Sequence, residues 1–348
     1  MERPHLAGIV EDGWNRWLGG ALRSRGWRPL VVPHAGYAGA DFVRVLARVV
    51  LAPEPDDDRR GGEHLREEQQ DRRGWRNFVT AEALDAEVTV TVGSVRHVTR
   101  TDRSGMVDVR VPNPGLEPGW QEVVVEATGS EPTVSRVFVV GADAGFGLVS
   151  DIDDTVIRTL LPRPLLAAYN TFVVQEEARH PVDGMAGLYE DLLRAHPGAP
   201  TVYVSTGAWN TAGTLTRFLA RHGYPAGPLL LTDWGPTNTG WFRSGPAHKR
   251  ACLESLAADF PRIRWVLVGD DGQHDPVIYA DFARDHPERV RAIAIRELTA
   301  TQQVLAHGTP VERLTAADER PPPGVPAVRG PDGAELARAL RPYGLGSG

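Results

Sequence analysis

The chain has 348 residues, of which 41% are hydrophobic and 24% charged, an ordinary composition for a soluble globular protein. This length exceeds what one ordinary core requires, so we expect two domains. The 45 acidic side chains outnumber the 38 Lys and Arg side chains, giving a formal net charge of −7. Such a surface repels a phosphate backbone, which argues against nucleic acid as the principal partner.

Apolar side chains recur at helical spacing near the N-terminus, so we predict an amphipathic helix within residues 1–28. Its tryptophans, Trp14 and Trp17, suit either docking onto the body of the protein or peripheral contact with the inner membrane surface. Docking is favoured, because Glu2, Glu11 and Asp12 weaken attraction to anionic lipid.

Cellular location follows from absences in the sequence. No apolar run approaches the length that spans a bilayer, and residues 1–30 lack an uninterrupted apolar region of signal-peptide type. A single cysteine, Cys252, excludes an intramolecular disulfide. We therefore expect a soluble, cytoplasmic protein.

Residues 29–142 alternate apolar and polar side chains with a period of two, as in 88–92, 107–111 and 134–140. Turn signals separate these short runs, which predicts an antiparallel β-sandwich domain. A mixed-charge run at 54–74 has almost nothing to bury, and we expect a solvated loop there. We see no chemistry in this domain, and its protein partner is unknown.

Residues 143–308 alternate strand-like and helix-like segments, which predicts a parallel sheet with right-handed crossovers. The expected strands are 147–150, 201–205, 229–231, 265–269 and 290–295, and the expected helices are 183–195, 209–222, 247–260 and 275–285. Residues 309–348 are Pro-rich, so we expect a loosely held tail with one short helix at 334–340.

The first expected strand of this sheet ends abruptly in acidic residues, in the segment FGLVSDIDDTVIRT at 146–159. Ligands of open α/β sheets bind outside the carboxyl ends of the strands. Carboxylates crowded at such an end repel one another unless a cation neutralises them, and Mg²⁺ prefers oxygen ligands of this kind. An acidic turn in which Asp154 or Thr155 caps the next segment is the simpler alternative.

Asp151-Ile152-Asp153-Asp154-Thr155 resembles the DxDxT motif of haloacid dehalogenase superfamily phosphatases. The resemblance implies that Asp151 is the nucleophile, that Asp153 is the general acid and base, and that Mg²⁺ is the cofactor.

The other parts of a phosphoryl-transfer site stand at later strand ends and helix starts. Ser205 ends the second strand and Thr206 follows it, where a hydroxyl can donate to a phosphoryl oxygen or simply cap the next helix. Lys249 begins a helix and resembles the lysine of the superfamily's third motif. Asp270 and Asp275 follow the fourth strand as a second acidic cluster. The expected Mg²⁺ ligands are Asp151, Asp153 through its backbone carbonyl, and Asp270, while Asp275 bonds metal-bound water or Lys249.

The closer resemblance is to the actin-patch-associated phosphatidate phosphatase family, carried by SDIDDT, YVSTGAWN, His248-Lys249 and GDDGQHDP. It implies a haloacid dehalogenase-like domain with helices on both faces of the sheet, following a β-rich region. The consecutive pair Asp270-Asp271 departs from the family pattern, which has a small second residue; Asp271 either adds charge to the metal site or points away.

The resemblance implies a Mg²⁺-dependent phosphatidate phosphatase that acts through an aspartyl-phosphate. We expect Thr155, Thr206 and Arg158 to contact the substrate, and Arg163 and Arg243 are further candidates for contact with its phosphate head group. Segment 160–172 either lines an entry for acyl chains or packs against the core, and segment 234–244 is a candidate lid or lipid-facing edge. Two alternatives stay open: a phosphatase of a soluble phosphomonoester, and a non-catalytic interaction protein acting through its β-sandwich.

Overall fold

The computed structural model describes residues 21–22, 24–53, 81–158, 180–232, 245–272, 274–299, 302 and 320–346. The chain divides into two compact units, with the main division between Val139 and Val140. The predicted N-terminal helix lies almost wholly outside the described residues, as does the charged run at 54–74. Within the described ranges, no helix is long and apolar enough to cross a bilayer.

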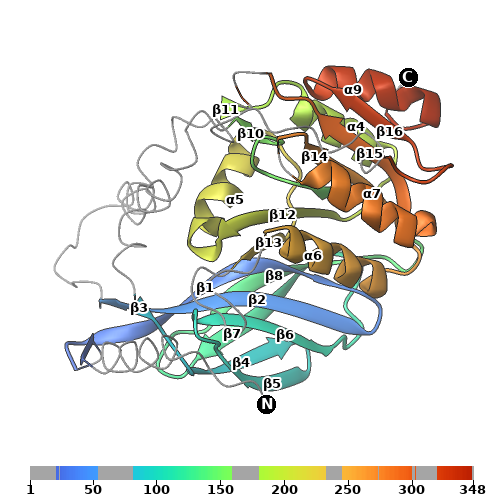
Figure 1. The fold of residues 1–348 in the computed structure, drawn as a ribbon. Helices are drawn as coiled ribbons and strands as arrows, with labels where there is room; N and C mark the ends of the chain where they lie inside the picture. The colour runs from blue at the N-terminus through green and yellow to red at the C-terminus, as the bar shows by residue number, and fades with distance from the viewer. Residues whose placement is uncertain are drawn as a thin grey trace, which may run out of the picture. The chain divides into compact units, whose positions relative to one another are not determined.

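The first unit is built from β-strands (Figure 1). They are β1 (Trp27–Ala38), β2 (Phe42–Pro53), β3 (Ala81–Glu82), β4 (Glu87–Val92), β5 (Val95–Arg100), β6 (Met106–Pro112), β7 (Gly119–Ala127) and β8 (Thr133–Val139). The sheet order is β3-β2-β1-β8-β7-β4-β5, with β6 also paired to β2. The pairs are antiparallel except for the parallel contact between β1 and β8.

Alternation of apolar and polar residues explains the core of this unit. Val88, Val90 and Val92 of β4 are buried, whereas Thr89 and Thr91 are partly exposed, because successive side chains of a strand point to opposite faces. The buried residues of β4 join those of β2, β6, β7 and β8 in one apolar cluster. The predicted antiparallel strands are therefore confirmed, and their classification as a sandwich stays a prediction.

The second unit holds a six-stranded parallel sheet. Its strands are β9 (Phe146–Ser150), β12 (Thr201–Ala208), β13 (Leu229–Thr232), β14 (Arg264–Asp270), β15 (Val290–Arg296) and β16 (Ala327–Gly330). The sheet order is β13-β12-β9-β14-β15-β16. Numbered along the chain this order is 3-2-1-4-5-6, and its winding direction reverses between β9 and β14. A ligand of such a sheet binds at the carboxyl end of these two strands.

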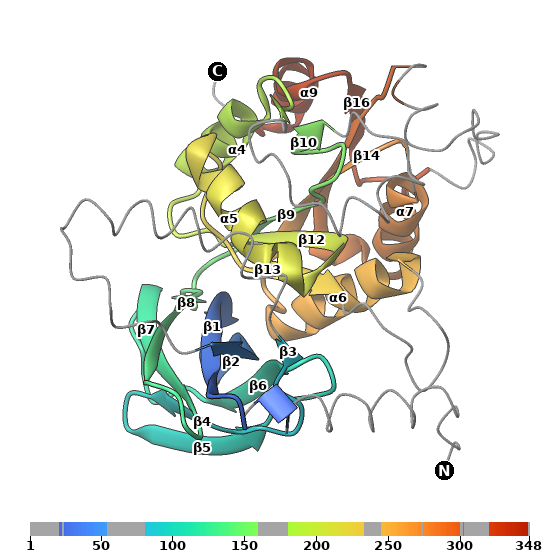
Figure 2. The same ribbon diagram turned by 90° about the vertical axis from the view of Figure 1, so that its left-hand side faces the viewer.

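Helices cover both faces of this sheet (Figure 2). They are α4 (Met185–Arg194), α5 (Ala212–Arg221), α6 (Gly245–Asp259), α7 (Asp275–Asp285) and α9 (Gly333–Leu340), with one-turn helices η2 (Trp209–Thr211), η3 (Pro287–Arg289) and η4 (Arg341–Tyr343). A short pair, β10 (Ile157–Arg158) and β11 (His180–Pro181), follows the first acidic motif. Helices α4, α5 and α9 pack into one core with alternate strand residues such as Leu148 and Val266. Val149 and Leu267, which point to the other face, are equally buried. The predicted parallel sheet of an α/β domain is confirmed.

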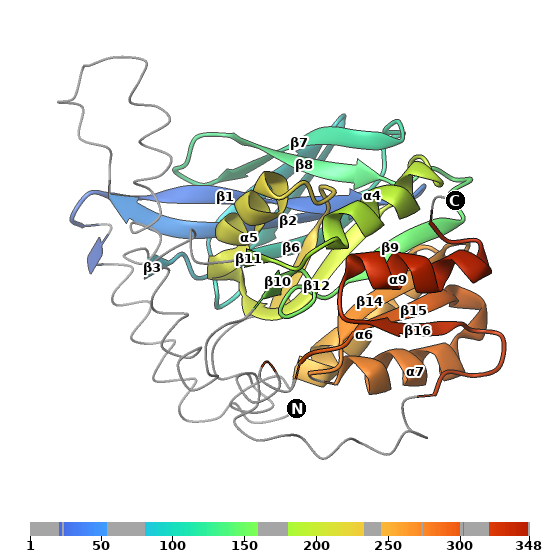
Figure 3. The same cartoon turned by 90° about the horizontal axis from the view of Figure 1, so that it is seen from above.

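The prediction of a loosely held C-terminal tail is wrong for the described residues 320–346. β16 pairs with β15 and extends the parallel sheet, and α9 follows it at the sheet edge (Figure 3). Leu336 and Leu340 of α9 are fully buried, and the Asp332 carboxylate caps the helix by accepting from the amides of Ala334 and Glu335, both at 3.0 Å. Four strand residues after a proline cluster are too few for a periodic pattern, which is why the strand escaped prediction.

Candidate active site

Two acidic strand ends meet at the reversal point of the sheet. The amide of Asp151, directly after β9, donates to the carbonyl of Val268 in β14 at 2.9 Å. Asp270 is the last residue of the same strand β14. Both side chains are almost fully buried, at 2% and 0% exposure. The sheet therefore holds two carboxylates side by side where its topology predicts a ligand.

Lys249 of α6 contacts the carboxylates at this end of the sheet. Its Nζ donates to Asp151 Oδ1 at 2.7 Å and to Asp275 Oδ1, at the start of α7, at 2.6 Å. Burial lowers the pKa of Lys249, but Asp151 and Asp275 outweigh it, so the pKa is raised and the ammonium stays charged. The buried group thus carries three carboxylates, those of Asp151, Asp270 and Asp275, against one ammonium.

This excess of buried negative charge fits a divalent cation. One ligand oxygen from each of Asp151, Asp270 and Asp275 lies within 4.8 Å of the others. Asp270 Oδ2 and Asp275 Oδ2 are buried and accept no hydrogen bond from the described residues. Burial raises the pKa of Asp151 to about 8 although Lys249 opposes the shift, and burial with Asp275 and Asp151 nearby raises the pKa of Asp270. Carboxylate oxygens of this kind suit Mg²⁺, which keeps several waters and is completed by substrate phosphate.

The loop after Asp151 is tightly folded around the motif. Thr155 Oγ1 donates to Asp151 Oδ2 at 3.2 Å, and Ser205 Oγ donates to Asp153 Oδ2 at 3.0 Å while accepting from the amide of Gly207 at 2.9 Å. Asp154 has a left-handed backbone with φ of 58°. The structure therefore connects the first motif to the end of β12 through Ser205.

Gly269 allows the second acidic cluster to fold back on β14. A Cβ at this position would lie 2.5 Å from Asp275 Oδ2 and 2.8 Å from the Tyr279 ring. Any side chain would therefore displace Asp275 from Lys249, so the close approach depends on glycine.

Two further motif residues make contacts outside the acidic cluster. Asp271 points away from the cluster: its Oδ1 accepts from the Leu298 amide at 2.8 Å, and its Oδ2 lies 3.9 Å from Arg329. His248 Nε2 lies 3.2 Å from the Leu230 carbonyl, on the packed side of α6.

Other predicted site residues have contacts that do not by themselves indicate a role in substrate binding. Arg158 is ion-paired with exposed Asp183, so its expected phosphate contact stays a prediction that requires breaking this pair. Thr206 follows Ser205, and its backbone carbonyl accepts from Thr232 Oγ1 at 2.8 Å. The carboxylate of Asp153 is not in the buried cluster, and its expected ligation through the backbone carbonyl stays a prediction. The segments 160–172 and 234–244, with Arg163 and Arg243, lie outside the described residues.

Sequence reasoning missed Arg296, the last residue of β15. Its side chain is buried, and Nη1 donates to the Asp154 carbonyl at 2.5 Å. The available signal was an arginine directly after the apolar run 292–295, at the same edge of the sheet as Asp151 and Asp270.

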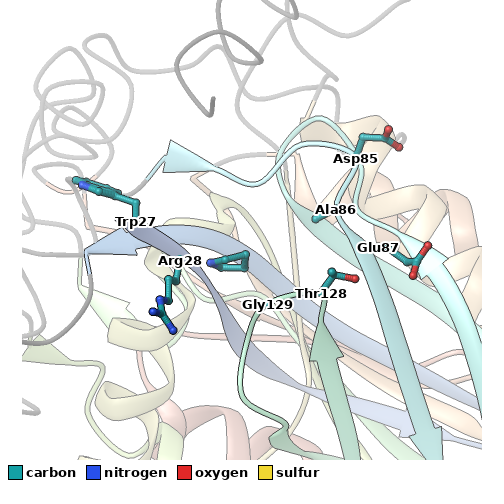
Figure 4. Close-up of a pocket in the computed structure, with 8 residues that line it drawn as sticks. Trp27, Arg28, Asp85, Ala86, Glu87, Thr128 and Gly129 are labelled. Atoms are coloured by element: carbon teal, nitrogen blue, oxygen red, sulfur yellow. The ribbon is translucent and has the colours of Figure 1, made fainter. Parts of the chain in front are cut away.

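The β-rich unit has a hollow of about 680 Å³ at the ends of β1, β4 and β7 (Figure 4). Trp27, Asp85 and Glu87 lie in its wall. Both carboxylates are ion-paired with the single guanidinium of Arg100, at 3.2 and 3.8 Å. We assign no activity to this hollow.

Comparison with known proteins gives a match over the residues that contain this site. Residues 146–297 match the family model described as phosphatidate phosphatase APP1, catalytic domain. Phosphatidate phosphatase APP1 of Saccharomyces cerevisiae is 28% identical over 155 residues, which are 44% of this chain and 26% of the yeast protein. An uncharacterized protein of Schizosaccharomyces pombe is 28% identical over 191 residues, 51% of this chain and 30% of its own length. The chain thus spans less than a third of the length of either relative.

Solved structures offer weaker likenesses. The HAD domain of the effector protein Lem4 from Legionella pneumophila superposes with a TM-score of 0.31 at 17% identity, covering 44% of this chain and 85% of that one. A carbohydrate acetylesterase from Xanthomonas citri reaches a TM-score of 0.28 at 10% identity, over 81% and 74%. These TM-scores are too low to add to the assignment.

The acidic cluster at this sheet edge lies within the residues that the family model matches. Residues 146–297 are thus similar to the phosphatidate phosphatase APP1 catalytic domain.

Proposed function

We propose that the chain is a Mg²⁺-dependent phosphatidate phosphatase that forms an aspartyl-phosphate on Asp151. The observation that carries this proposal is the buried contact of Lys249 with both Asp151 and Asp275, next to Asp270, at the reversal point of the sheet. A purely structural acidic turn has no need of a buried lysine and unpartnered carboxylate oxygens, because both are costly to bury.

In the first step an oxygen of Asp151 attacks phosphorus and the bond from phosphorus to the ester oxygen breaks. Asp153 gives its proton to the departing oxygen, which leaves as an alcohol. In the second step a water molecule attacks the phosphorus of the aspartyl-phosphate, Asp153 takes the proton of that water, and the bond to Asp151 breaks. Inorganic phosphate and free Asp151 result.

The surrounding side chains hold these two carboxylates in place. Lys249 and Thr155 contact different oxygens of Asp151, at 2.7 and 3.2 Å, which fixes the plane of the carboxylate. The Ser205 hydroxyl donates a hydrogen bond to Asp153. We propose that it donates to a phosphoryl oxygen instead when substrate binds. Mg²⁺, held by Asp151, Asp270 and Asp275, would neutralise charge on the phosphoryl oxygens.

The substrate assignment comes from the yeast relative, which is named as a phosphatidate phosphatase. Phosphatidic acid is a phosphate monoester, so the same two steps would convert it into diacylglycerol and phosphate. A soluble phosphomonoester fits the described residues equally well, and it remains the second candidate.

Phosphate release separates the candidates. With Mg²⁺, we expect the full chain to release phosphate from phosphatidic acid vesicles and not from a panel of soluble phosphomonoesters, and we expect EDTA to stop the reaction. Release from soluble esters alone would establish the second candidate. No release from either, or from an aryl phosphate, would instead favour a non-catalytic interaction protein.

We also propose a fold type for each unit and a cellular location for the protein. We propose a Rossmann-like arrangement for the α/β unit, because its strand order and parallel pairing are those of doubly wound sheets. We propose a β-sandwich for the first unit, supported by the single core that its strands share. A cytoplasmic protein that meets lipid at the inner membrane surface would suit a phosphatidate substrate.

A further inference from the structure

Arg296 is a buried cation at the catalytic edge that the two proposed steps do not use. Its side chain is 3% exposed, and its guanidinium donates in three directions. Nη1 donates to the Asp154 carbonyl at 2.5 Å, Nε to the Pro331 carbonyl at 3.2 Å, and Nη2 to Gln302 Oε1 at 3.3 Å. A planar guanidinium serves such diverging acceptors at fixed angles, which an ammonium does not.

The acceptor of its shortest bond lies in the most constrained part of the site. Asp154 stands between Asp153 and Thr155, and its φ of 58° is unusual for a residue with a side chain. The loop is closed by the Asp154 amide on the Ile157 carbonyl at 2.8 Å and by the amides of Val156 and Ile157 on the Ile152 carbonyl at 2.9 and 3.0 Å. A backbone held in this conformation persists only when its surroundings fix it.

The second acceptor links this loop to the C-terminal segment, which lies beyond the residues that the family model matches. Two residues after Pro331, the Gly333 amide donates to the Asp183 carbonyl at 2.9 Å. Gly333 also packs against the Gly184 backbone so closely that a Cβ would lie 2.2 Å from the Gly184 carbonyl. Residues 331–333 therefore form a fixed support against which Arg296 is held.

We propose that Arg296 is a positioning residue for the proposed phosphatase reaction: braced by residues 331–333, it fixes the Asp154 carbonyl and thereby the directions of Asp151, Asp153 and Thr155. The C-terminal segment, at first sight a tail, is then part of the catalytic apparatus. The expected change in kcat rests on the proposed function. The expected change in the loop does not, because hydrogen exchange measures the loop without turnover.

Arg296→Met removes the donors and keeps most of the side-chain volume. With an aryl phosphate and Mg²⁺ we expect kcat to fall by about 100-fold and KM to change by less than about threefold, because a misplaced catalytic group costs rate more than binding. We expect Arg296→Lys, which keeps the charge and one donor direction, to lose only about tenfold in kcat. Hydrogen exchange should show the amides of Asp154, Val156 and Ile157 exchanging at least about tenfold faster in Arg296→Met.

Arg291→Met is the matched control. Arg291 lies in the same strand and also holds the C-terminal segment, through a 2.8 Å bond to the Tyr343 carbonyl, but among the described residues it has no hydrogen bond to the loop. It should keep wild-type kcat and wild-type exchange at 154–157. The proposal is overturned if Arg296→Met keeps wild-type kcat and loop exchange, or if Arg291→Met causes the same losses. If Arg296→Met does not fold, the same two readouts on Arg296→Lys decide. A wild-type protein without phosphatase activity would defeat the proposed function, and the exchange comparison would still test the positioning.

Discussion

Asp151→Asn should reduce turnover by about 10⁴-fold or more while leaving the fold intact, because it removes the attacking oxygen and little else. The Lys249 ammonium would keep its 2.6 Å contact with Asp275, so the substitution leaves no buried cation alone. Steady-state kinetics with an aryl phosphate and Mg²⁺, beside circular dichroism spectra of both proteins, would measure the two effects.

Asp281→Asn is a suitable control for this variant. Asp281 lies on α7 and pairs with Arg250 and Arg284 at the surface, where loss of a carboxylate has little effect. We expect wild-type turnover from it. Substantial Mg²⁺-dependent activity in Asp151→Asn would show that another group attacks phosphorus.

Lys249→Met should damage both stability and catalysis. The Lys249 side chain is buried, and among the described residues it is the cation that is ion-paired with Asp151 and Asp275. Removing one member of a buried ion pair costs about 3–5 kcal/mol of unfolding free energy, so we expect a loss of this size in EDTA. Loss of a charge that stabilises the transferring phosphoryl group lowers kcat by a further factor of about 10²–10³.

Urea denaturation followed by the helical circular dichroism signal would measure the stability loss, because α4 to α9 all lie in the second unit. The neighbouring Arg250→Met is the control: Arg250 is half-exposed and pairs with Asp281, so its loss should cost less than about 1 kcal/mol. Equal stability of Lys249→Met and wild type would mean that the buried ion pairs do not hold this edge of the sheet together.

The convergence of the two acidic motifs was predictable because each follows a strand that is buried on both faces. Runs such as 146–149 and 265–269 are continuously apolar, and their parallel pairing brings Asp151 and Asp270 to one edge. The order of motifs along the chain then supplied Ser205, Lys249 and Asp275. The residue roles stay predictions, whereas their proximity is a property of the structure.

What escaped prediction depends on contacts between distant segments. Arg296 looks like any residue after a strand until the carbonyls of Asp154 and Pro331 are brought to it. β16 has only four residues, and the fully buried Leu336 and Leu340 acquire meaning only once α9 packs beside α4. The direction of Asp271 was equally open, because its partner Leu298 lies at the end of the next strand.

One compositional signal for the site went unused. Lys249 is the only lysine of the chain, since every other basic side chain that counts toward the 38 is arginine. The compact Lys249 ammonium lies between two carboxylates, at 2.6 and 2.7 Å. A guanidinium is planar and differs from it in shape and size. A chain that otherwise uses arginine thus places its one lysine where an ammonium is required.

The most direct test of the account is to find the phosphorylated residue. Asp153→Asn should slow hydrolysis of the aspartyl-phosphate, because no base takes the proton of the attacking water, while an aryl phosphate leaves without a donated proton. Acid quenching followed by borohydride reduction converts an aspartyl-phosphate into homoserine, which mass spectrometry locates. The account predicts homoserine at position 151. Homoserine at another aspartate, or none in a protein that turns over aryl phosphate, would contradict it.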